Sequence, residues 1–501
     1  MIKNIGSNWL VTVVTIVATY FLMPFTIHRL GTDSYGTWNL VNAITGYLGL
    51  LVLGVPMASV RYFAQHVANG DEKKLNQAIG SCTALYLLLG AIALVVGAGL
   101  YAFFTQYQIP TPLHGDARWA FALMVLFVSL GFVGLLPNGI LAAHDDFVPR
   151  NAVRLWGVLL RLVLTFALLT LRASLTVLAL VQLACMVFDF ALCWLLVRRR
   201  YPAIRIRLAD LDWGLTRAIF AFSLYVLVLN AGARLAFETD AIVIGAFMDV
   251  GSIPYFTVAN SFIIYLMEFL IAIAAVVMPT ATRLQAQGKT AETRAIFLKW
   301  SKIALSLTLA AGLFLIVLGP RFIAWWVDPT FERPAGQVLQ ILMLSYLIFL
   351  PVRGVALPIL MGLGKAGLST IGFLVAGVVN LGLSIALVRP LGLVGVALGT
   401  AIPNVLFAAL VFLQACRELD VSVGAFLRYV VPRALLGALP VLALLLWFKQ
   451  GLGVRSITAL AAAGVAMVLV FAVTWVFYVY RNDPYVDLRG GLARLRVWGK
   501  A

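Results

Sequence analysis

Three arginines lie in one apolar stretch of the chain, residues 150–171. Arg150, Arg154 and Arg161 are spaced by four and seven residues, so in a helix they share one face. Gly157 lies between the last two on that face and leaves a groove there. The planar guanidinium binds phosphate through two parallel hydrogen bonds. Arg154 and Arg161 are therefore candidates to line a cavity for a phosphate-bearing ligand, with snorkelling or internal pairing as the alternatives. Arg161 is too deep to snorkel easily, so we predict a cavity role for it, and we interpret Arg150 as an interfacial arginine.

A second set of charges interrupts the apolar run at residues 219–247, which we predict to be one helix. Arg234, Glu238 and Asp240 all lie inside it. A charge at membrane depth costs at least about 2.5–3.5 kcal/mol, so such residues face protein or water and are functional candidates. Arg234 and Glu238 also have the i,i+4 spacing of a structural ion pair, and this alternative stays open. Asp240 should lie about 120° around the helix from Arg234.

The remaining candidates are single charged residues within apolar runs. Arg353 follows Pro351 and is predicted to line the cavity from the second half of the chain. A buried carboxylate can take up a proton in one state and lose it in another, which suits coupling to a proton or sodium gradient. Structural pairing with an arginine is the alternative for each of the four buried acids, which are Asp189, Glu238, Asp240 and Glu268.

The composition identifies a polytopic membrane protein. The 501 residues are 62% hydrophobic and 11% charged, whereas ordinary domains are about 45–50% apolar and about 25% charged. The formal charge of +17 would suggest a nucleic-acid partner in a soluble chain, but here the basic residues sort by loop, so we expect none. The four cysteines and four histidines have no metal-ligand spacing, and we expect neither a metal nor a cofactor.

Apolar runs separated by polar turns predict an all-α chain with about fourteen spans. The expected spans are residues 9–27, 36–53, 78–104, 119–142, 150–171, 173–197, 219–247, 255–278, 302–318, 336–360, 368–387, 393–413, 429–447 and 457–480. Prolines at 137, 351 and 358 should kink or break their helices.

Basic residues concentrate in alternate loops, by roughly threefold, which predicts both termini on the cytoplasmic side. The loops with the excess include Arg198, Arg199 and Arg200, and the set ends in a basic tail. The basic residues of this tail include Arg489, Arg494, Arg496 and Lys500.

An internal repeat relates the two halves of the chain at an offset of about 220 residues. Tyr35 aligns with Tyr255, and Pro137 aligns with Pro358. An even number of spans per copy makes the repeats parallel, and two such bundles around a central cavity are typical of an alternating-access transporter. The predicted organisation is a six-helix bundle at 1–210, a second at 211–426, and two extra helices with the basic tail at 427–501.

Enzyme chemistry finds little support in the sequence. The predicted outer loops are short, and the chain has no Walker A motif. The acidic pair Asp145–Asp146 lies beside His144 and is interpreted as a solvated turn. We expect no enzyme, with a membrane-embedded glycan-modifying enzyme as the alternative.

Several stretches together resemble a known family. They are LGTDSYGTWNL at 30–40, TDAIVIGAFMDVGSIPYFTVA at 239–259, the segment 322–351 and LGLVGVALGTAIP at 391–403. In this order they are similar to the polysaccharide transporter family, the Wzx-like O-antigen and exopolysaccharide flippases. This branch belongs to the multidrug/oligosaccharidyl-lipid/polysaccharide exporter superfamily, and the resemblance covers nearly the whole chain.

The resemblance implies transport of an undecaprenyl-diphosphate-linked oligosaccharide from the inner to the outer leaflet of a bacterial inner membrane. It implies a cationic cavity, for which Arg154, Arg161, Arg234 and Arg353 are the candidates, and Asp240 matches the acid of the TDAIVIG motif. A polymerase and a chain-length regulator of the same pathway are the implied partners, and we expect a monomer. An ion-coupled multidrug or cation antiporter of the same superfamily is the alternative.

Overall fold

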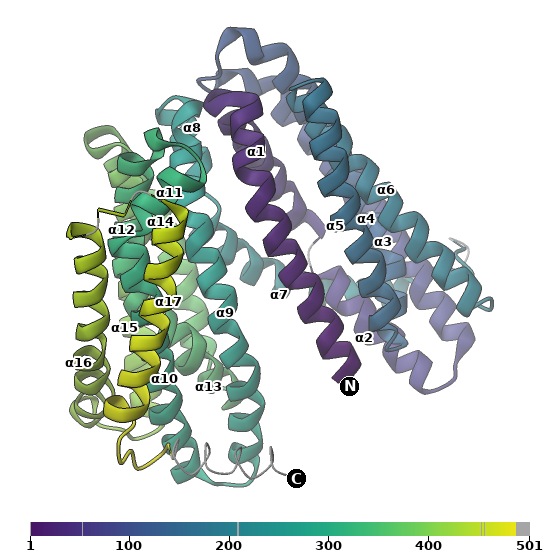
Figure 1. Cartoon of the computed structure of the whole chain (residues 1–501). Coiled ribbons are helices and arrows are strands. Elements are labelled where there is room, and N and C mark those ends of the chain that lie inside the picture. The colour runs from purple at the N-terminus through teal and green to yellow at the C-terminus, as the bar shows by residue number, and fades with distance from the viewer. Residues whose placement is uncertain (1, 53, 208–209, 452, 455, 487–501) are drawn as a thin grey trace, which may run out of the picture. The chain divides into compact units, whose positions relative to one another are not determined.

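The structure is a computed structural model that describes residues 2–52, 54–207, 210–451, 453–454 and 456–486. These residues form helices joined by short turns and contain no strand (Figure 1). The all-α prediction is therefore confirmed for the described part of the chain. The basic tail predicted at the C-terminus begins at Arg481, and its part from Arg489 onward lies outside the described residues.

Twelve helices of the described residues are long and apolar enough to cross a membrane. One of them, Gly6–Ala68, covers both of the first two predicted spans, and the helix at Trp213–Phe237 is not among the twelve. The chain is a multi-pass membrane protein, and the total of fourteen spans stays a prediction.

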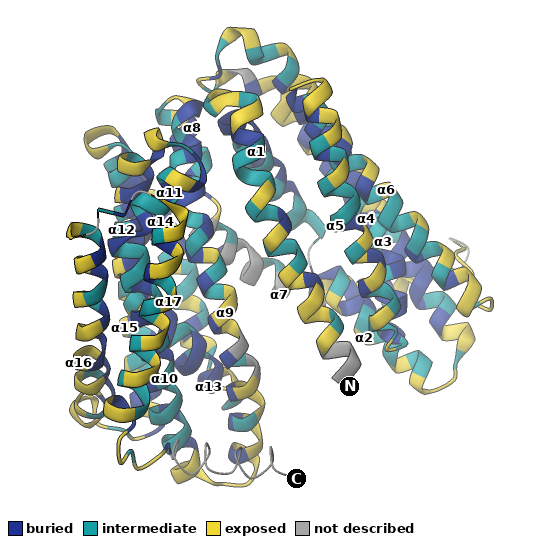
Figure 2. Cartoon of the chain, in the orientation of Figure 1, coloured by how far each residue is buried: buried dark blue, intermediate teal, exposed yellow. Residues whose placement is uncertain are grey.

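The chain divides into two compact units, Met1–Pro254 and Tyr255–Ala501. The first is built from α1 (Ile2–Leu48), α2 (Val55–Ala68), α3 (Glu72–Phe103), α4 (His114–Ala143), α5 (Phe147–Leu171), α6 (Leu175–Arg200), α7 (Trp213–Phe237) and α8 (Asp240–Phe247). Its core lies among α2, α3, α4 and α6, where Phe63, Tyr86 and Ile140 are fully buried. Figure 2 shows the buried positions along the inner faces of these helices.

Within α1, the backbone is not helical at Gly31, where φ is 78° and ψ is 168°. Glycine adopts this region without the steric cost that other residues carry. The kink separates the predicted first span, residues 9–27, from the second, which begins at residue 36.

The predicted helix at 219–247 is wrong in one respect, because it is broken. The helix α7 ends at Phe237, and α8 begins at Asp240 after a turn at Glu238 and Thr239. Glu238 occupies the C-cap position and Thr239 the N-cap position of the next helix. Arg234 and Asp240 therefore lie on different helices, and the expected 120° relation on a single helix does not apply.

The second unit contains α9 (Ile253–Ala286), which starts at the boundary, α10 (Thr290–Val317), α11 (Gly319–Trp326), α12 (Glu332–Pro351), α13 (Leu357–Gly362), α14 (Gly367–Leu391), α15 (Leu393–Glu418), α16 (Val423–Gln450) and α17 (Ile457–Thr474). Between Pro351 and Pro358 the helix changes to a π-helix over Val352–Ala356, a geometry that is frequent at functional sites. A second π-helix, Trp475–Val479, follows α17. By contrast, α4 continues through Pro137.

Two carboxylates fix helix ends in the first unit. Asp116 on α4 accepts hydrogen bonds from the Leu175 and Thr176 amides at the start of α6, and these amides have no partner within their own helix.

Asp146 accepts hydrogen bonds from Arg200 at 2.8 Å and from the Tyr201 hydroxyl at 2.7 Å. Burial and this hydrogen bond raise the pKa of Tyr201 to about 12. The interpretation of Asp145–Asp146 as a solvated turn is therefore wrong for Asp146, which holds the end of α6.

Candidate functional site

A cavity of about 380 Å³ lies in the first unit among α1, α4, α5 and α6. Arg154 and Arg161 line it from α5, and Asp189 lines it from α6. The two arginines share the face of α5 that their spacing predicts. Arg150, one turn earlier, does not line this cavity and packs over the Phe147 ring at 5.0 Å. Sequence and structure thus separate the same two arginines from the third.

Gly157 explains how the acid of α6 comes to lie against α5. This glycine is buried, and a β-carbon on it would overlap the Asp189 carboxylate. Any larger residue here would push the carboxylate away from the arginine-bearing face. The groove left by Gly157 is therefore occupied in part by Asp189, a contact that the sequence alone did not predict.

The charges in this cavity are not in direct contact with one another, although Arg154 interacts electrostatically with Asp189. Among the described residues, Arg154 and Arg161 form no ion pair within 4.0 Å and no hydrogen bond, and the buried Oδ1 of Asp189 has no hydrogen-bond partner. Buried polar atoms are ordinarily satisfied, so an exception calls for an explanation. Two guanidinium groups and one carboxylate leave the cavity with an excess of positive charge. The arrangement suits an anion that can accept several hydrogen bonds.

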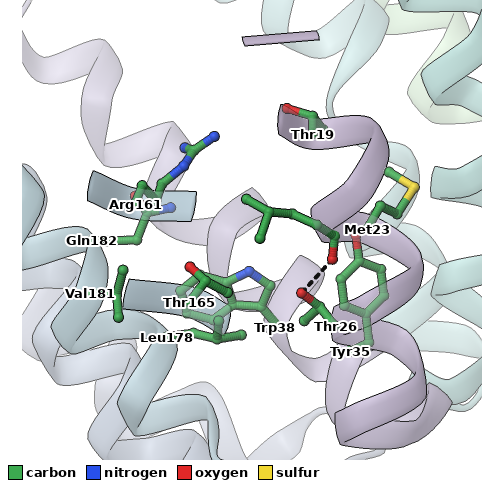
Figure 3. Close-up of a pocket in the computed structure, with 11 residues that line it drawn as sticks. Thr19, Met23, Thr26, Tyr35, Trp38, Arg161, Thr165, Leu178, Val181 and Gln182 are labelled. Atoms are coloured by element: carbon green, nitrogen blue, oxygen red, sulfur yellow. Dashed lines mark hydrogen bonds between the residues drawn. The ribbon is translucent and has the colours of Figure 1, made fainter. Parts of the chain in front are cut away.

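A smaller cavity of about 160 Å³ adjoins the first one (Figure 3). Its walls come from both halves of α1 and from α5 and α6, and they include Tyr35 and Trp38. Arg161 and Gln182 line both cavities. A ligand bound to Arg161 can therefore extend in either direction.

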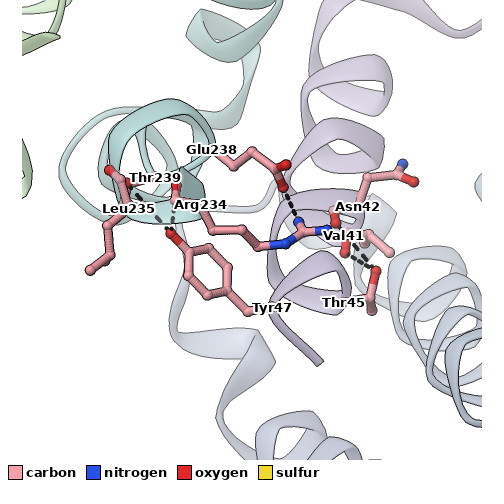
Figure 4. A network of polar contacts seen from close by, with 8 residues as sticks. All are labelled: Val41, Asn42, Thr45, Tyr47, Arg234, Leu235, Glu238 and Thr239. Atoms are coloured by element: carbon pink, nitrogen blue, oxygen red, sulfur yellow. Dashed lines mark hydrogen bonds and ion pairs between the residues drawn. The ribbon is translucent and has the colours of Figure 1, made fainter. Parts of the chain in front are cut away.

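Arg234 lies elsewhere and is paired. Its guanidinium donates to the Glu238 carboxylate, one helical turn along, as the i,i+4 alternative predicts (Figure 4). The Tyr47 hydroxyl of α1 donates to the Arg234 carbonyl oxygen at 3.3 Å. A β-carbon at Gly46 would lie 2.6 Å from the Arg234 guanidinium, so this glycine provides the room for it. Arg234 thus ties the end of α7 to α1 and does not line the cavity of Arg154.

The remaining predicted residues, Asp240, Glu268 and Arg353, are not among the residues that line the cavity of Arg154. Asp240 is buried in the first turn of α8, where a negative charge is favoured by the helix dipole. Arg353 belongs to the π-helix of the second unit and lies over the Phe349 and Phe373 rings at 5.9 and 5.7 Å. Glu268 of α9 interacts electrostatically with it. Of the four predicted arginines, the structure brings together Arg154 and Arg161.

Sequence reasoning missed a buried ion pair in the second unit. Lys302 on α10 donates to Asp483 at 2.5 Å, and both side chains are 0% exposed. The Tyr429 hydroxyl also donates to Asp483, at 2.7 Å, and the ammonium group lies 5.0 Å from the Tyr480 ring centroid. Burial opposes ionisation of Asp483, but the hydrogen bonds from Lys302 and Tyr429 hold its pKa below the ordinary value.

The sequence placed Lys302 at the start of a span, where lysine is usually interfacial. The helix actually begins at Thr290, which puts Lys302 in its middle. With the correct helix bounds, the sequence would have shown a lysine in the middle of an apolar helix, which indicates a buried partner of opposite charge. In the described part of the chain, no group of three His, Cys, Asp or Glu side chains is placed to hold a metal ion.

Comparisons with known proteins agree with this architecture. The profile of the family described as "Polysaccharide biosynthesis protein" matches residues 1–285, more than half of the chain. A protein of Shigella flexneri described as a candidate O-antigen transporter is 25% identical over 126 residues. That match covers 25% of this chain and 30% of the relative, so it spans less than a third of the relative's length.

Solved structures support the fold alone. An inward-facing multidrug resistance MATE family transporter of the MOP superfamily matches with a TM-score of 0.71 at 20% identity, covering 80% of this chain and 94% of that one. The lipid II flippase MurJ, in an inward closed conformation, matches with a TM-score of 0.69 at 12% identity, covering 95% and 99%. The chain therefore belongs to the family described as "Polysaccharide biosynthesis protein", and its fold is similar to that of the MATE family transporter and of MurJ.

Proposed function

We propose that the protein is a flippase that moves an undecaprenyl-diphosphate-linked oligosaccharide from the inner to the outer leaflet of the bacterial inner membrane, by ion-coupled alternating access. The observation that carries this proposal is the cavity with Arg154 and Arg161, whose guanidinium groups form no ion pair within 4.0 Å and no hydrogen bond among the described residues. A diphosphate offers several anionic oxygens to such a pair. Membership of the polysaccharide biosynthesis family supports a lipid-linked glycan as the cargo.

For ion coupling, Asp189 is the favoured group of the four buried acids. It lines the same cavity as the two arginines and has an unpartnered buried oxygen. A proton or sodium ion bound there would change the charge next to the ligand, which couples the two binding events. Glu238 forms an ion pair with Arg234 and is assigned a structural role, whereas Glu268 belongs to the second unit, where it interacts electrostatically with Arg353. Asp240 is kept as a second coupling candidate.

For the membrane arrangement, we propose fourteen spans, with parallel repeats at 1–210 and 211–426 and both termini in the cytoplasm. Gly70 and Gly288 are 218 residues apart, close to the repeat offset of about 220. Their φ angles are 67° and 68°. The helices α3 and α10 begin soon after these turns. This shared local geometry supports the repeat. The Arg234 and Arg353 positions are proposed to approach the transported glycan in other states of the cycle.

Deletion of the gene tests the function. In a strain without a paralogue, lipid-linked repeat units should accumulate on the inner leaflet, and surface polysaccharide should be lost. Wild-type protein should restore export, whereas the Arg154→Ala, Arg161→Ala double variant should not, at equal membrane levels. Intact surface polysaccharide in the deletion strain would exclude this function. Drug sensitivity without any glycan defect would favour a multidrug antiporter instead.

A further inference from the structure

The smaller cavity differs chemically from the larger one. Arg161 is the one charged residue in its lining, which otherwise consists of hydroxyl, amide, aromatic and apolar side chains. It has no acid, so it does not suit a cation. Its volume of about 160 Å³ is room for on the order of ten water molecules, since one water needs about 10–15 Å³. A single monosaccharide has a comparable number of heavy atoms.

Two side chains in this cavity carry hydrogen-bonding groups that the protein does not use. Among the described residues, the Gln182 amide and the Trp38 indole N–H have no hydrogen-bond partner, and both line the cavity beside Arg161 (Figure 3). The Thr26 hydroxyl, by contrast, donates to the Leu22 carbonyl oxygen at 2.7 Å. An amide offers two donors and an acceptor, and an indole offers one donor. This set matches a neutral group with several hydroxyls.

Arg161 links the two cavities. It lies about 10 Å along α5 from Arg154, at 1.5 Å per residue, and its side chain reaches both spaces. In a lipid-linked oligosaccharide the first sugar is bonded directly to the diphosphate. If the diphosphate occupies the larger cavity, the next group along the ligand is a sugar, and the neighbouring space is the smaller cavity.

We propose that the cavity of Trp38, Gln182 and Arg161 is the binding site for the first sugar of the cargo. The Gln182 amide and the Trp38 indole bind its hydroxyl groups, and the Trp38 ring forms part of the wall against which the sugar packs. This proposal rests on the proposed function, because it takes the diphosphate to lie between Arg154 and Arg161.

The test uses the full chain in lipid nanodiscs and isothermal titration. The probes are farnesyl diphosphate and farnesyl diphosphate bearing one glucose, galactose or N-acetylglucosamine. Wild-type protein should bind at least one sugar-bearing probe about tenfold more tightly than farnesyl diphosphate, the size expected for one or two net hydrogen bonds. Gln182→Met keeps side-chain size and Trp38→Phe keeps an aromatic ring, and each should lower this ratio several-fold. Because Trp38 does not line the larger cavity, Trp38→Phe should leave the affinity for farnesyl diphosphate unchanged.

Two controls separate the possible failures. Arg161→Ala should weaken binding of every probe, and Gln337→Met, at an exposed position on α12, should change nothing. Equal affinity of the wild type for sugar-free and all sugar-bearing probes overturns the sugar site while leaving the diphosphate site standing. The same conclusion follows if neither Gln182→Met nor Trp38→Phe alters the ratio. Failure of the wild type to bind any diphosphate probe overturns the proposed function and the sugar site together.

Discussion

Two groups of charges, one in each helical unit, are built in opposite ways. In the first unit, Arg154, Arg161 and Asp189 face a cavity without a mutual ion pair among the described residues, and one buried carboxylate oxygen has no partner. In the second unit, Lys302 and Asp483 are in direct contact, wholly buried, and surrounded by tyrosines. The first group is open, because its charges face a cavity and have no direct partner. The second group is closed, because its two charges contact each other and are shielded from solvent.

This difference separates a binding role from a structural one. A closed buried pair offers nothing to a ligand, because the ammonium group is bonded to the carboxylate and enclosed by two tyrosine rings. It instead joins α10 to the segment after α17, and the Arg433 guanidinium donates to the Arg481 carbonyl oxygen nearby. An open set of charges costs stability until something binds, which is the usual condition of a functional site. The following variants test whether a residue binds the ligand or stabilises the fold.

The largest effect is expected from Asp483→Asn. It leaves the Lys302 ammonium buried without a counter-charge, which destabilises by about 3–5 kcal/mol. The melting temperature of purified protein should fall sharply, and export should fall only with the amount of folded protein. Glu292→Gln is the control. Glu292 lies on α10, as Lys302 does, and the ion pair that it forms with Lys289 is exposed. Equal melting temperatures for the two variants would mean that the buried pair is not a structural tie.

Acid should weaken the same tie. The pKa of Asp483 in the folded protein is below its ordinary value, so the carboxylate contributes stability above the unfolded pKa, about 3.9. That contribution is lost as the pH falls through the lower folded value. The melting temperature of the wild type should therefore drop below about pH 4 more steeply than that of a Lys302→Met, Asp483→Leu double variant. Parallel curves for the two proteins would contradict the assignment.

Arg161→Ala should impair function without unfolding. Loss of a charge-assisted hydrogen bond costs about 1.5–3 kcal/mol, or roughly ten- to a hundredfold in affinity. Export per unit of membrane protein should fall accordingly, with an unchanged melting temperature. Arg150→Ala should have a smaller effect, since Arg150 does not line the cavity. Equal export by the two variants would remove the distinction between them.

Gly157→Ala should reduce function without reducing stability. Alanine is favoured over glycine within a helix by about 0.8–1 kcal/mol, but its β-carbon would displace the Asp189 carboxylate. We expect a melting temperature near that of the wild type and export reduced several-fold. The Gly157→Ala, Asp189→Ser double variant tests whether the overlap with the carboxylate is the cause, because the smaller serine leaves room for the new β-carbon. If the fold loosens as much as export falls, the close contact serves packing alone.

The smallest effect concerns Arg234 and Glu238. The two side chains are 27% and 46% exposed, so their ion pair contributes about 0.2–1 kcal/mol. In a double-mutant cycle with Arg234→Ala and Glu238→Ala, the double variant should export better than the product of the two single effects predicts. Strictly additive losses would instead assign the two residues separate roles.

Spacing within one helix was readable from the sequence. It predicted which face of α5 carries Arg154 and Arg161, and it offered the Arg234–Glu238 pair as one of two alternatives, because both depend on the helical period alone. The apolar runs likewise located most helices to within several residues.

Contacts between distant segments were not readable in this way. Lys302 and Asp483 are 181 residues apart, and nothing local marks them as partners. The break between α7 and α8 was missed because Glu238 and Thr239 lie within an apolar run that has neither glycine nor proline at the turn. The contact of Gly157 with Asp189 depends on how two helices pack, which spacing does not determine.

That contact also has an evolutionary consequence. A glycine at position 157 and an acid at position 189 fill one volume between two helices, so neither position is free to drift independently of the other. Across related sequences, a larger residue at 157 should be accompanied by a smaller or uncharged residue at 189. Such paired replacement would identify relatives in which the carboxylate lies at another position or transport is not coupled to an ion. An alignment of related sequences would reveal it.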